Sequence, residues 1–167
     1  RSFNHRWGKV FPECEPKLTP VAKVLGLDGQ AKMSKSLGNH LPLASMEDKP
    51  LRKLLGRAVT DVKRVERTDP GDPDVCNVFA WHGMFSTDED RAWVRAGCTT
   101  ASIGCVDCKG RLAERMLEHF GPYRERRAEL VAHPERVKDA LHAGAEKARA
   151  IARKTMDEVR HKLGLWR

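Results

Sequence analysis

The segment from Lys32 to Ser36 carries a dense group of side chains that can bind an anion. Its sequence, Lys-Met-Ser-Lys-Ser, places two ammonium groups and two hydroxyl groups within five positions. Gly26, Gly29 and Gly38 flank the segment and give its backbone freedom to bend. Lysine ammonium groups suit phosphate oxygens, and serine hydroxyls and backbone amides can hold neighbouring oxygens. The pattern predicts a mobile polyphosphate-binding loop, and the alternative is an ordinary basic surface loop.

Four of the five cysteines form a second candidate site. Cys76, Cys98, Cys105 and Cys108 are separated by gaps of 21, six and two residues, whereas Cys14 stands apart. The two-residue gap allows the last two thiolates to turn toward one ion or cluster. Four interpretations are open: disulfide bonds, structural zinc, an iron–sulfur cluster, and buried thiols that only fill space.

The lysine-rich segment resembles the second signature sequence of the class I aminoacyl-tRNA synthetases, a mobile loop that grips ATP during adenylate formation. Further segments resemble the tryptophanyl-tRNA synthetases of bacterial type over nearly the whole chain, and the tyrosyl enzymes are a weaker match. These segments are Phe3-Asn4-His5-Arg6-Trp7-Gly8, Phe11-Pro12-Glu13, Ala58-Val59-Thr60-Asp61, Thr68-Asp69-Pro70-Gly71, Arg124-Glu125-Arg126-Arg127 and Gly144-Ala145-Glu146-Lys147-Ala148-Arg149.

The resemblance implies a tryptophan–tRNA ligase, which joins L-tryptophan to tRNA(Trp) through an adenylate made from ATP. It implies that Lys32 and Lys35 are catalytic and bind the phosphates, with Lys35 stabilising the transition state. Ser34, Ser36 and the backbone of Met33 would shape the loop and bind the nucleotide, and Mg²⁺ would accompany it. We expect the parent enzyme to be a cytoplasmic homodimer.

A fragment is expected rather than a whole enzyme. The chain begins at Arg1, and it has no run resembling the first class I signature, His-Ile-Gly-His. It is therefore interpreted as the C-terminal portion of the enzyme, without the tryptophan pocket and inactive alone. The alternative function is a non-catalytic tRNA-binding module or a diverged synthetase paralogue.

The resemblance also bears on the cysteines. A similar set in some bacterial tryptophanyl-tRNA synthetases holds a [4Fe-4S] cluster in the anticodon-binding part. We therefore favour [4Fe-4S] bound by Cys76, Cys98, Cys105 and Cys108 as a structural staple, with Zn²⁺ as the alternative. Zinc ribbons usually show two close cysteine pairs, and a cytosolic synthetase keeps its thiols reduced, which disfavours disulfides.

Charge points to a polyanionic partner. Lysine and arginine number 31 against 23 acidic residues, giving a net charge of +8 and a pI near 9.5. Lys109, Arg111 and Arg115, beside the cysteines, are the candidates for contacts with RNA. No run of 18 apolar residues and no signal-like start occur, so no membrane association is predicted.

The pattern beyond residue 50 is helical. Apolar residues at three- and four-residue steps predict a helix from Pro50 to Thr60-Asp61, and residues 61 to 76 form a turn-rich connector. An aromatic cluster is assigned to the core: Val78, Phe79, Trp81, Met84 and Phe85. Further helices are expected from Leu112 to a stop at Gly121-Pro122, from Pro122 through Val131, from Pro134 to Gly144, and onward to Gly164. The third is expected to bury Val137, Ala140 and Leu141.

The predicted fold is mainly α. Residues 1–43 are assigned to the remnant of an α/β doubly wound nucleotide-binding domain, with the loop and a last strand near Val21 and Val24. Residues 44–167 are assigned to a helical bundle, the anticodon-binding part, which carries the four-cysteine site.

Overall fold

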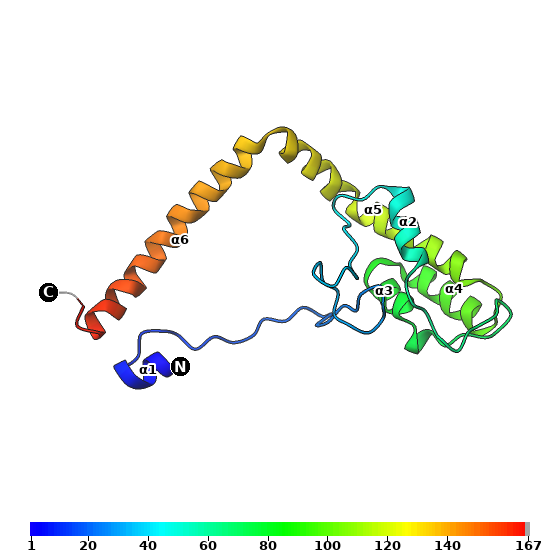
Figure 1. Ribbon diagram of the computed structural model, residues 1–167, viewed down its shortest axis with the longest axis horizontal. Helices are drawn as coiled ribbons and strands as arrows, with labels where there is room; N and C mark the ends of the chain where they lie inside the picture. Colours follow the sequence, from blue (N-terminus) through cyan, green and yellow to red (C-terminus); the bar gives the residue numbers. More distant parts are fainter. Residues whose placement is uncertain (166–167) are drawn as a thin grey trace. The chain divides into compact units, whose positions relative to one another are not determined.

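The computed structural model describes residues 1–165, and its regular structure is helical (Figure 1). The α-helices are α1 (Ser2–Trp7), α2 (Asp48–Gly56), α3 (Asn77–Phe85), α4 (Asp88–Thr99), α5 (Cys105–Ala132) and α6 (Pro134–Lys162), with a 3₁₀ helix, η1 (Pro73–Val75), before α3. The mainly α class is confirmed. No helix among these residues combines the length and apolar character needed to cross a membrane.

Extended structure within the described residues is limited to one antiparallel bridge, between Leu25 and Lys32. The strand expected near Val21 and Val24 is therefore not formed as a regular strand. A strand is stabilised by ladders of hydrogen bonds to its neighbours, and here the pairing ends after one bridge.

Two compact units make up the chain. One contains residues 1–20 together with residues 129–167, and the other contains residues 21–128. Both candidate sites predicted from the sequence fall in the second unit, which holds α2, α3, α4 and most of α5.

The core of the second unit joins helices that are distant in sequence. Its fully buried side chains come from α2 (Leu51, Leu55), α3 (Val78, Trp81) and α5 (Leu112, Ala113, Met116). Pairs spaced by four residues, as in α2, lie on one face of a helix, so the amphipathic pattern explains their burial. The assignment of Val78 and Trp81 to the core is confirmed.

Helix α4 was not anticipated, although its start has a clear sequence signal. Thr87 is the N-cap, and its hydroxyl accepts a hydrogen bond from the N–H of Asp90. Acidic residues fill the first turn at Asp88, Glu89 and Asp90, where they stabilise the positive end of the helix dipole.

The expected break at Gly121-Pro122 was wrong, because α5 runs through Pro122 without ending. Proline removes one backbone N–H from the helix ladder, which leaves carbonyl groups of the preceding turn short of donors. The carbonyl affected is that of Glu118, four residues before Pro122, and α5 continues despite this loss. Arg124 Nη2 lies 2.7 Å from the neighbouring carbonyl oxygen, that of Leu117.

The expected stop at Gly144 was also wrong, because α6 is one helix of 29 residues. A single glycine inside a long helix costs only about 1 kcal/mol relative to alanine. The predicted stop at Gly164 is confirmed: this residue has φ +68°, and its N–H bonds the carbonyl of His161.

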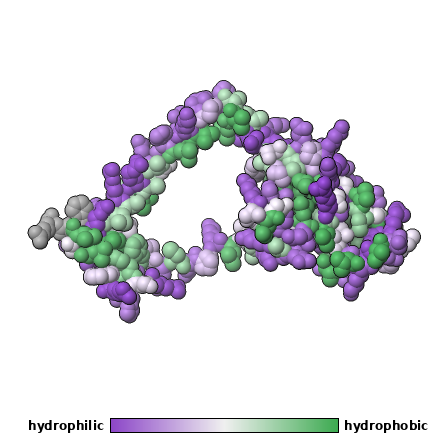
Figure 2. Space-filling view, in the orientation of Figure 1, coloured by the Kyte–Doolittle hydropathy of each residue, from purple (hydrophilic) through white to green (hydrophobic). Residues whose placement is uncertain are grey.

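The apolar face of α6 is not buried as expected. Val137 and Leu141 are 40% and 68% exposed, and Val159 is the buried residue of the helix. Figure 2 shows apolar side chains along one side of α6 and hydrophilic side chains along the other. The spacing of the apolar residues thus predicted which face of α6 is apolar. Burial of Val137 and Leu141 would require a packing partner that the described residues of this unit do not provide.

Candidate functional site

The lysine-rich segment begins on the second arm of a short hairpin. Leu25 and Lys32 form the antiparallel bridge, and the N–H of Gly26 donates to the carbonyl of Ala31 at 2.9 Å. Asp28 makes the turn, because its Oδ1 accepts a hydrogen bond of 3.2 Å from the N–H of Ala31. The sequence therefore positions the signature lysines at the end of a tight turn.

Asn39 ties the trailing end of the segment to this turn. It is buried, and its Oδ1 accepts a 2.8 Å hydrogen bond from the N–H of Ser34. Its Nδ2 donates to Asp28 Oδ2 at 2.9 Å and lies 3.4 Å from the carbonyl oxygen of Lys32. A Cβ on Gly26 would stand 2.2 Å from Asn39 Nδ2, so only glycine leaves room for this tether.

The hydrogen bonds keep Asp28 ionised. The N–H of Gln30 has the largest effect and the Asn39 amide the next, and both lower the pKa of Asp28 below its ordinary value of 3.8. The ionised Asp28 carboxylate thus accepts the hydrogen bonds that hold the hairpin turn.

The signature side chains divide between an exposed and a packed set. Lys32, Lys35 and Ser36 are exposed, and Ser34 Oγ lies 2.8 Å from Ser36 Oγ. Met33 packs against the hydrophobic core and lines an apolar pocket of about 210 Å³. The methionine therefore anchors the segment, while both ammonium groups face solvent and can meet a charged ligand. The structure brings together all five residues predicted for this site.

The four cysteines lie at helix ends. Cys76 is the N-cap of α3 and is buried, and Cys98 lies in the last turn of α4. Cys105 and Cys108 occupy the first turn of α5, three residues apart and so on one side of the helix. The positive end of a helix dipole favours a thiolate. All four are free thiols, and Cys14 is an exposed thiol in the other unit.

The four sulfurs share one electrostatic environment. Burial, followed by the charges of Cys76, Cys105 and Cys98, raises the pKa of Cys108 to about 12. Burial is also the main cause that raises the pKa of Cys98, with Cys76 and Cys105 adding to it and Arg64 opposing it. Because each thiolate disfavours the others, a bound cation would be needed to keep several of them deprotonated.

The arrangement of the thiols does not by itself indicate a metal site. Among the described residues, no three His, Cys, Asp or Glu side chains are grouped closely enough to hold one metal ion. A pocket of about 380 Å³ is lined in part by Cys105, Arg64 and Arg67, and the other three cysteines of the set do not line it.

Three polar neighbours of these sulfurs were missed from the sequence: Thr60, Arg64 and His82. Each lies within hydrogen-bond range of one thiol, namely Cys105, Cys98 and Cys108 respectively. Between 26 and 45 residues separate the members of each pair, so no local pattern could have identified them.

The basic residues proposed as RNA contacts are engaged within the fold. Lys109 Nζ donates to the carbonyl oxygens of Gly56 and Ala58 at 2.9 and 2.8 Å, which caps the end of α2. Burial lowers the pKa of Lys109, although the neighbouring cysteines oppose this effect.

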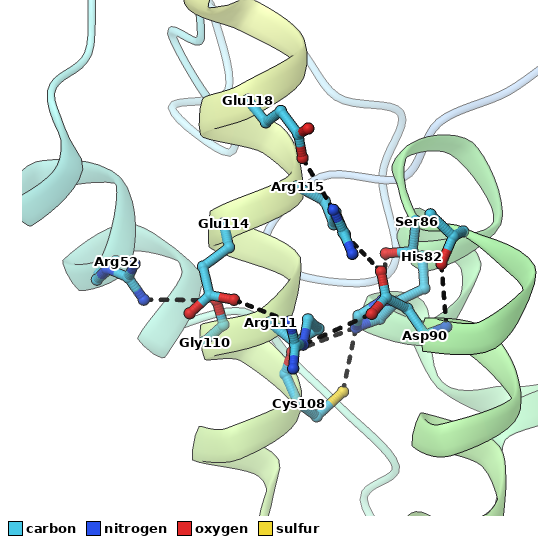
Figure 3. Close-up of polar contacts among 11 residues, drawn as sticks. Arg52, His82, Ser86, Asp90, Cys108, Gly110, Arg111, Glu114, Arg115 and Glu118 are labelled. Carbon is cyan, nitrogen blue, oxygen red and sulfur yellow. Dashed lines mark hydrogen bonds and ion pairs between the residues drawn. The ribbon is translucent and has the colours of Figure 1, made fainter.

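Arg111 and Arg115 both reach Asp90, a carboxylate with a side chain that is only 10% exposed (Figure 3). Arg115 Nε lies 2.5 Å from Asp90 Oδ2, and its Nη1 lies 2.9 Å from Glu118. The hydrogen bond from Arg115 is the main cause that lowers the pKa of Asp90. These arginines join α4 to α5.

Comparisons with known proteins identify the family of the chain. The family model for class I tRNA synthetases of the tryptophan (W) and tyrosine (Y) type matches residues 1–121. The tryptophan–tRNA ligase of Deinococcus radiodurans is 47% identical over 165 residues, which are 98% of this chain and 50% of that protein. The corresponding ligase of Thermotoga maritima is 44% identical over 166 residues, 99% of this chain and 50% of that protein.

A solved structure gives the same result. Tryptophanyl-tRNA synthetase from Campylobacter jejuni, complexed with ADP and tryptophan, superposes with a TM-score of 0.76 at 33% identity. The match covers 96% of this chain and 50% of that one. The chain thus spans about half the length of its relatives and corresponds to their C-terminal half. From its hairpin, its helices and these matches, the chain belongs to the class I tRNA synthetases of the tryptophan and tyrosine type.

Proposed function

We propose that this chain is the C-terminal part of a tryptophan–tRNA ligase, which forms tryptophanyl-adenylate from tryptophan and ATP and then charges tRNA(Trp). The names of the relatives support this reaction, and the exposed hairpin with Lys32 and Lys35 is the observation that carries it. In this proposal residues 1–43 complete the catalytic domain and residues 44–167 bind the anticodon end of the tRNA. The parent enzyme is a cytoplasmic homodimer.

Adenylate formation is an in-line displacement. A carboxylate oxygen of tryptophan attacks the α-phosphorus of ATP, the new P–O bond forms, and the bond to pyrophosphate breaks. Negative charge shifts onto the leaving phosphates, so positioned cations lower the barrier more than proton transfer would. Lys32 and Lys35 supply these cations, and Lys35 is assigned to the transition state. Ser34 and Ser36 hold the remaining oxygens, and the backbone of Met33, whose N–H bonds the carbonyl of Val24, shapes the loop.

Mg²⁺ is proposed to enter with the nucleotide. The carboxylate of Asp28, at the turn of the hairpin, already accepts bonds from Gln30, Ala31 and Asn39. Asp28 is therefore occupied by the turn, and the phosphates of ATP are the natural ligands of the ion. The ion would neutralise phosphate charge alongside the two lysines.

Recognition of tRNA is proposed to rest on exposed arginine and lysine side chains that contact phosphates and on unpaired bases that stack on flat side chains. Because Lys109, Arg111 and Arg115 serve the fold, we no longer assign them to this role. Exposed cations remain available on α6, including Lys147, Arg149 and Arg153.

The cysteine set is proposed to hold a [4Fe-4S] cluster through Cys76, Cys98, Cys105 and Cys108. The spacing of the four thiols supports this proposal, and so do their mutual electrostatic influence and the placement of two of them at the start of α5. When bound, it would supply a cross-link between α3, α4 and α5. Zn²⁺ is the alternative metal.

Exchange and binding measurements test the proposal. This chain is mixed with ATP, tryptophan and labelled pyrophosphate, and its binding to tRNA(Trp) is measured at several salt concentrations. We expect no exchange and a binding constant that falls steeply with salt. Complete ligase containing this chain should exchange pyrophosphate; if it binds tRNA(Trp) without exchange, the non-catalytic tRNA-binding module is correct.

Metal analysis of protein purified without oxygen tests the cluster. A broad brown absorbance with iron and acid-labile sulfide supports [4Fe-4S]. A colourless sample with one equivalent of zinc would establish the alternative, and a sample with neither metal would exclude both.

A further inference from the structure

An exposed tryptophan stands on α4, in the unit of residues 21–128. Trp93 is 42% exposed, whereas Trp81, in the core of the same unit, is 1% exposed. Tryptophan is enriched at binding surfaces, because its indole offers a large rigid area and loses little conformational entropy on binding. The Trp93 ring therefore presents a flat apolar surface to a ligand.

Arg111 of α5 holds this ring in place. Its Cζ lies 5.6 Å from the centroid of the Trp93 ring, which is a cation–π arrangement. The guanidinium is itself fixed by two carboxylates, because its Nε lies 3.6 Å from Asp90 and its Nη1 lies 3.3 Å from Glu114 (Figure 3). The contribution of Arg111 to the fold is thus to orient the indole.

A pocket of about 390 Å³ opens beside the indole. Trp93 and Ile103 form its apolar wall, and the rest is lined by residues of α5: Val106, Asp107, Gly110, Arg111 and Glu114. These α5 residues recur at steps of three and four positions, so they share one face of the helix. The pocket, called the Trp93 pocket below, combines a flat apolar wall with charged groups.

Close packing of the loop between α4 and α5 fixes the apolar wall. The N–H of Ile103 bonds the carbonyl oxygen of Gly97 at 3.2 Å. A Cβ on Gly97 would stand 2.8 Å from Ile103 Cγ1, so glycine at this position lets the loop lie against α4. Because Gly97 follows Trp93 by one helical turn, this contact holds Ile103 at the same pocket as the indole.

An exposed cation lies at the adjoining pocket. The pocket of about 380 Å³ described above shares Val106 and Asp107 with the Trp93 pocket, and it carries the exposed Arg67. An aromatic surface beside a cation is the combination that binds single-stranded nucleic acid, because bases stack on the ring while phosphates contact the cation. The net charge of +8 favours the same class of partner.

Glu114 provides a means of discriminating among bases. Its side chain is 54% exposed, and one carboxylate oxygen contacts Arg111. The second oxygen can accept a hydrogen bond from the base, and a carboxylate cannot donate one. Cytosine, adenine and guanine carry exocyclic amino donors, whereas uracil has a carbonyl oxygen where cytosine has its amino group. Glu114 therefore favours a base with an amino group.

We propose that the Trp93 pocket receives one unpaired base of tRNA(Trp), which stacks on the indole of Trp93 and donates an amino hydrogen to Glu114. Arg67 contacts a phosphate next to this base. The inference rests on the function proposed above, and it specifies the flat side chain and the class of base used in recognising the RNA. It does not depend on the cysteine site.

Binding of RNA to the full chain tests the role of Trp93. The affinity for labelled tRNA(Trp) is measured by fluorescence anisotropy. We expect Trp93→Leu to weaken binding about 5- to 150-fold, because one stacking contact is lost. Trp93→Phe retains an aromatic ring and should restore most of the affinity. Trp7→Leu is the matched control: Trp7 lies on α1, is 47% exposed, and should be replaceable without effect on binding.

The salt dependence of binding separates stacking from phosphate contacts. Trp93→Leu should weaken binding at every salt concentration and leave the slope of log affinity against log salt unchanged, because it removes no charge. Arg67→Gln should reduce the magnitude of this slope by about 1. Circular dichroism checks that each variant folds.

Base preference tests the role of Glu114. The wild-type chain should bind a labelled oligocytidylate more tightly than an oligouridylate of the same length. Glu114→Ala should abolish this preference, since the acceptor is lost while Asp90 still holds Arg111. A preference that is absent in the wild type, or that persists in Glu114→Ala, would remove Glu114 from base recognition.

Pyrophosphate exchange by the complete wild-type ligase tests the proposed function independently. If that ligase exchanges pyrophosphate and Trp93→Leu binds tRNA(Trp) as the wild-type chain does, the Trp93 pocket is not an RNA site and the proposed function stands. If Trp93→Leu and Trp93→Phe are equally weak and the salt slope changes, Trp93 only supports the fold and the inference is again wrong. A complete ligase without exchange would overturn the proposed function, whatever the result at Trp93.

Discussion

The Asn39 side chain bonds the backbone N–H of Ser34 at 2.8 Å while its own amide holds Asp28 across the hairpin. This buried residue joins the turn before the signature to the middle of the signature itself. Lys32 and Lys35, on either side of Ser34, are exposed. We expect their positions to depend on the bond between Asn39 and Ser34. Asn39 is thus the structural link between a conventional turn and the proposed ATP contacts.

Replacing Asn39 tests this link. In the complete ligase, we expect Asn39→Ala to lower kcat/KM for ATP in pyrophosphate exchange by about 10- to 100-fold, because misplaced catalytic groups lose much of their effect. The exposed neighbour Leu37 is the control, since Leu37→Ala removes a side chain that is 62% exposed and should change little. Equal rates for Asn39→Ala and wild type would show that the tether does not position the lysines.

Removal of the Lys35 ammonium should reduce the rate of adenylate formation more than the replacement of Asn39 does. In the complete ligase, Lys35→Ala should slow adenylate formation by about 100-fold or more with little change in tryptophan binding, because a transition-state cation is lost. Single-turnover kinetics separate the chemical step from binding. Lys23→Ala removes an exposed lysine ahead of the hairpin and serves as the control. A normal chemical rate in Lys35→Ala would remove this residue from the mechanism.

Gly71 provides a steric probe of the cysteine site. Because its Cβ would stand 2.6 Å from Cys98 Sγ, Gly71→Ala should displace the sulfur and reduce metal affinity about tenfold or more. Gly83→Ala is a matched control on α3, where an added Cβ meets no atom within 4 Å. Metal titration of both variants measures their metal affinities. Equal affinities of Gly71→Ala and Gly83→Ala would place the metal away from Cys98.

The contact between Asp90 and Arg115 predicts a pH-dependent contribution to stability. Arg115→Met should lower the thermal midpoint of unfolding at pH 7 by several degrees, since it leaves Asp90 with only its weaker partner Arg111 at 3.6 Å. The folded-state pKa of Asp90 lies below its unfolded value of 3.8, so the stabilisation is present above that pH and is lost as pH falls through the folded value.

The difference between Arg115→Met and wild type should therefore shrink when the pH is lowered from 5 to below 3.8. Thermal scans of both proteins at each pH provide the measurement. Arg91→Met, which removes an exposed ion pair with Asp88, should show a much smaller difference at pH 7. If the difference in unfolding midpoint between Arg115→Met and wild type does not change with pH, Arg115 acts through packing and not through charge.

Much of the candidate site could be predicted from sequence because its residues are neighbours along the chain. Lys32 to Ser36 form one hairpin segment, and Cys105 and Cys108 share one helical turn, so short-range geometry alone brings them together. The apolar steps of α2 and α5 likewise determined which faces are buried.

The sequence by itself thus determined the signature loop, the spacing of the thiols, the helical class and the stop at Gly164. Tertiary structure alone decided that α5 continues past Pro122 and that Arg115 binds Asp90 instead of facing solvent. It also decided that Arg64 meets Cys98 across 34 positions. The physical reason is that local preferences depend on a few adjacent residues, whereas charge pairing and burial depend on which distant segments the packed core brings together.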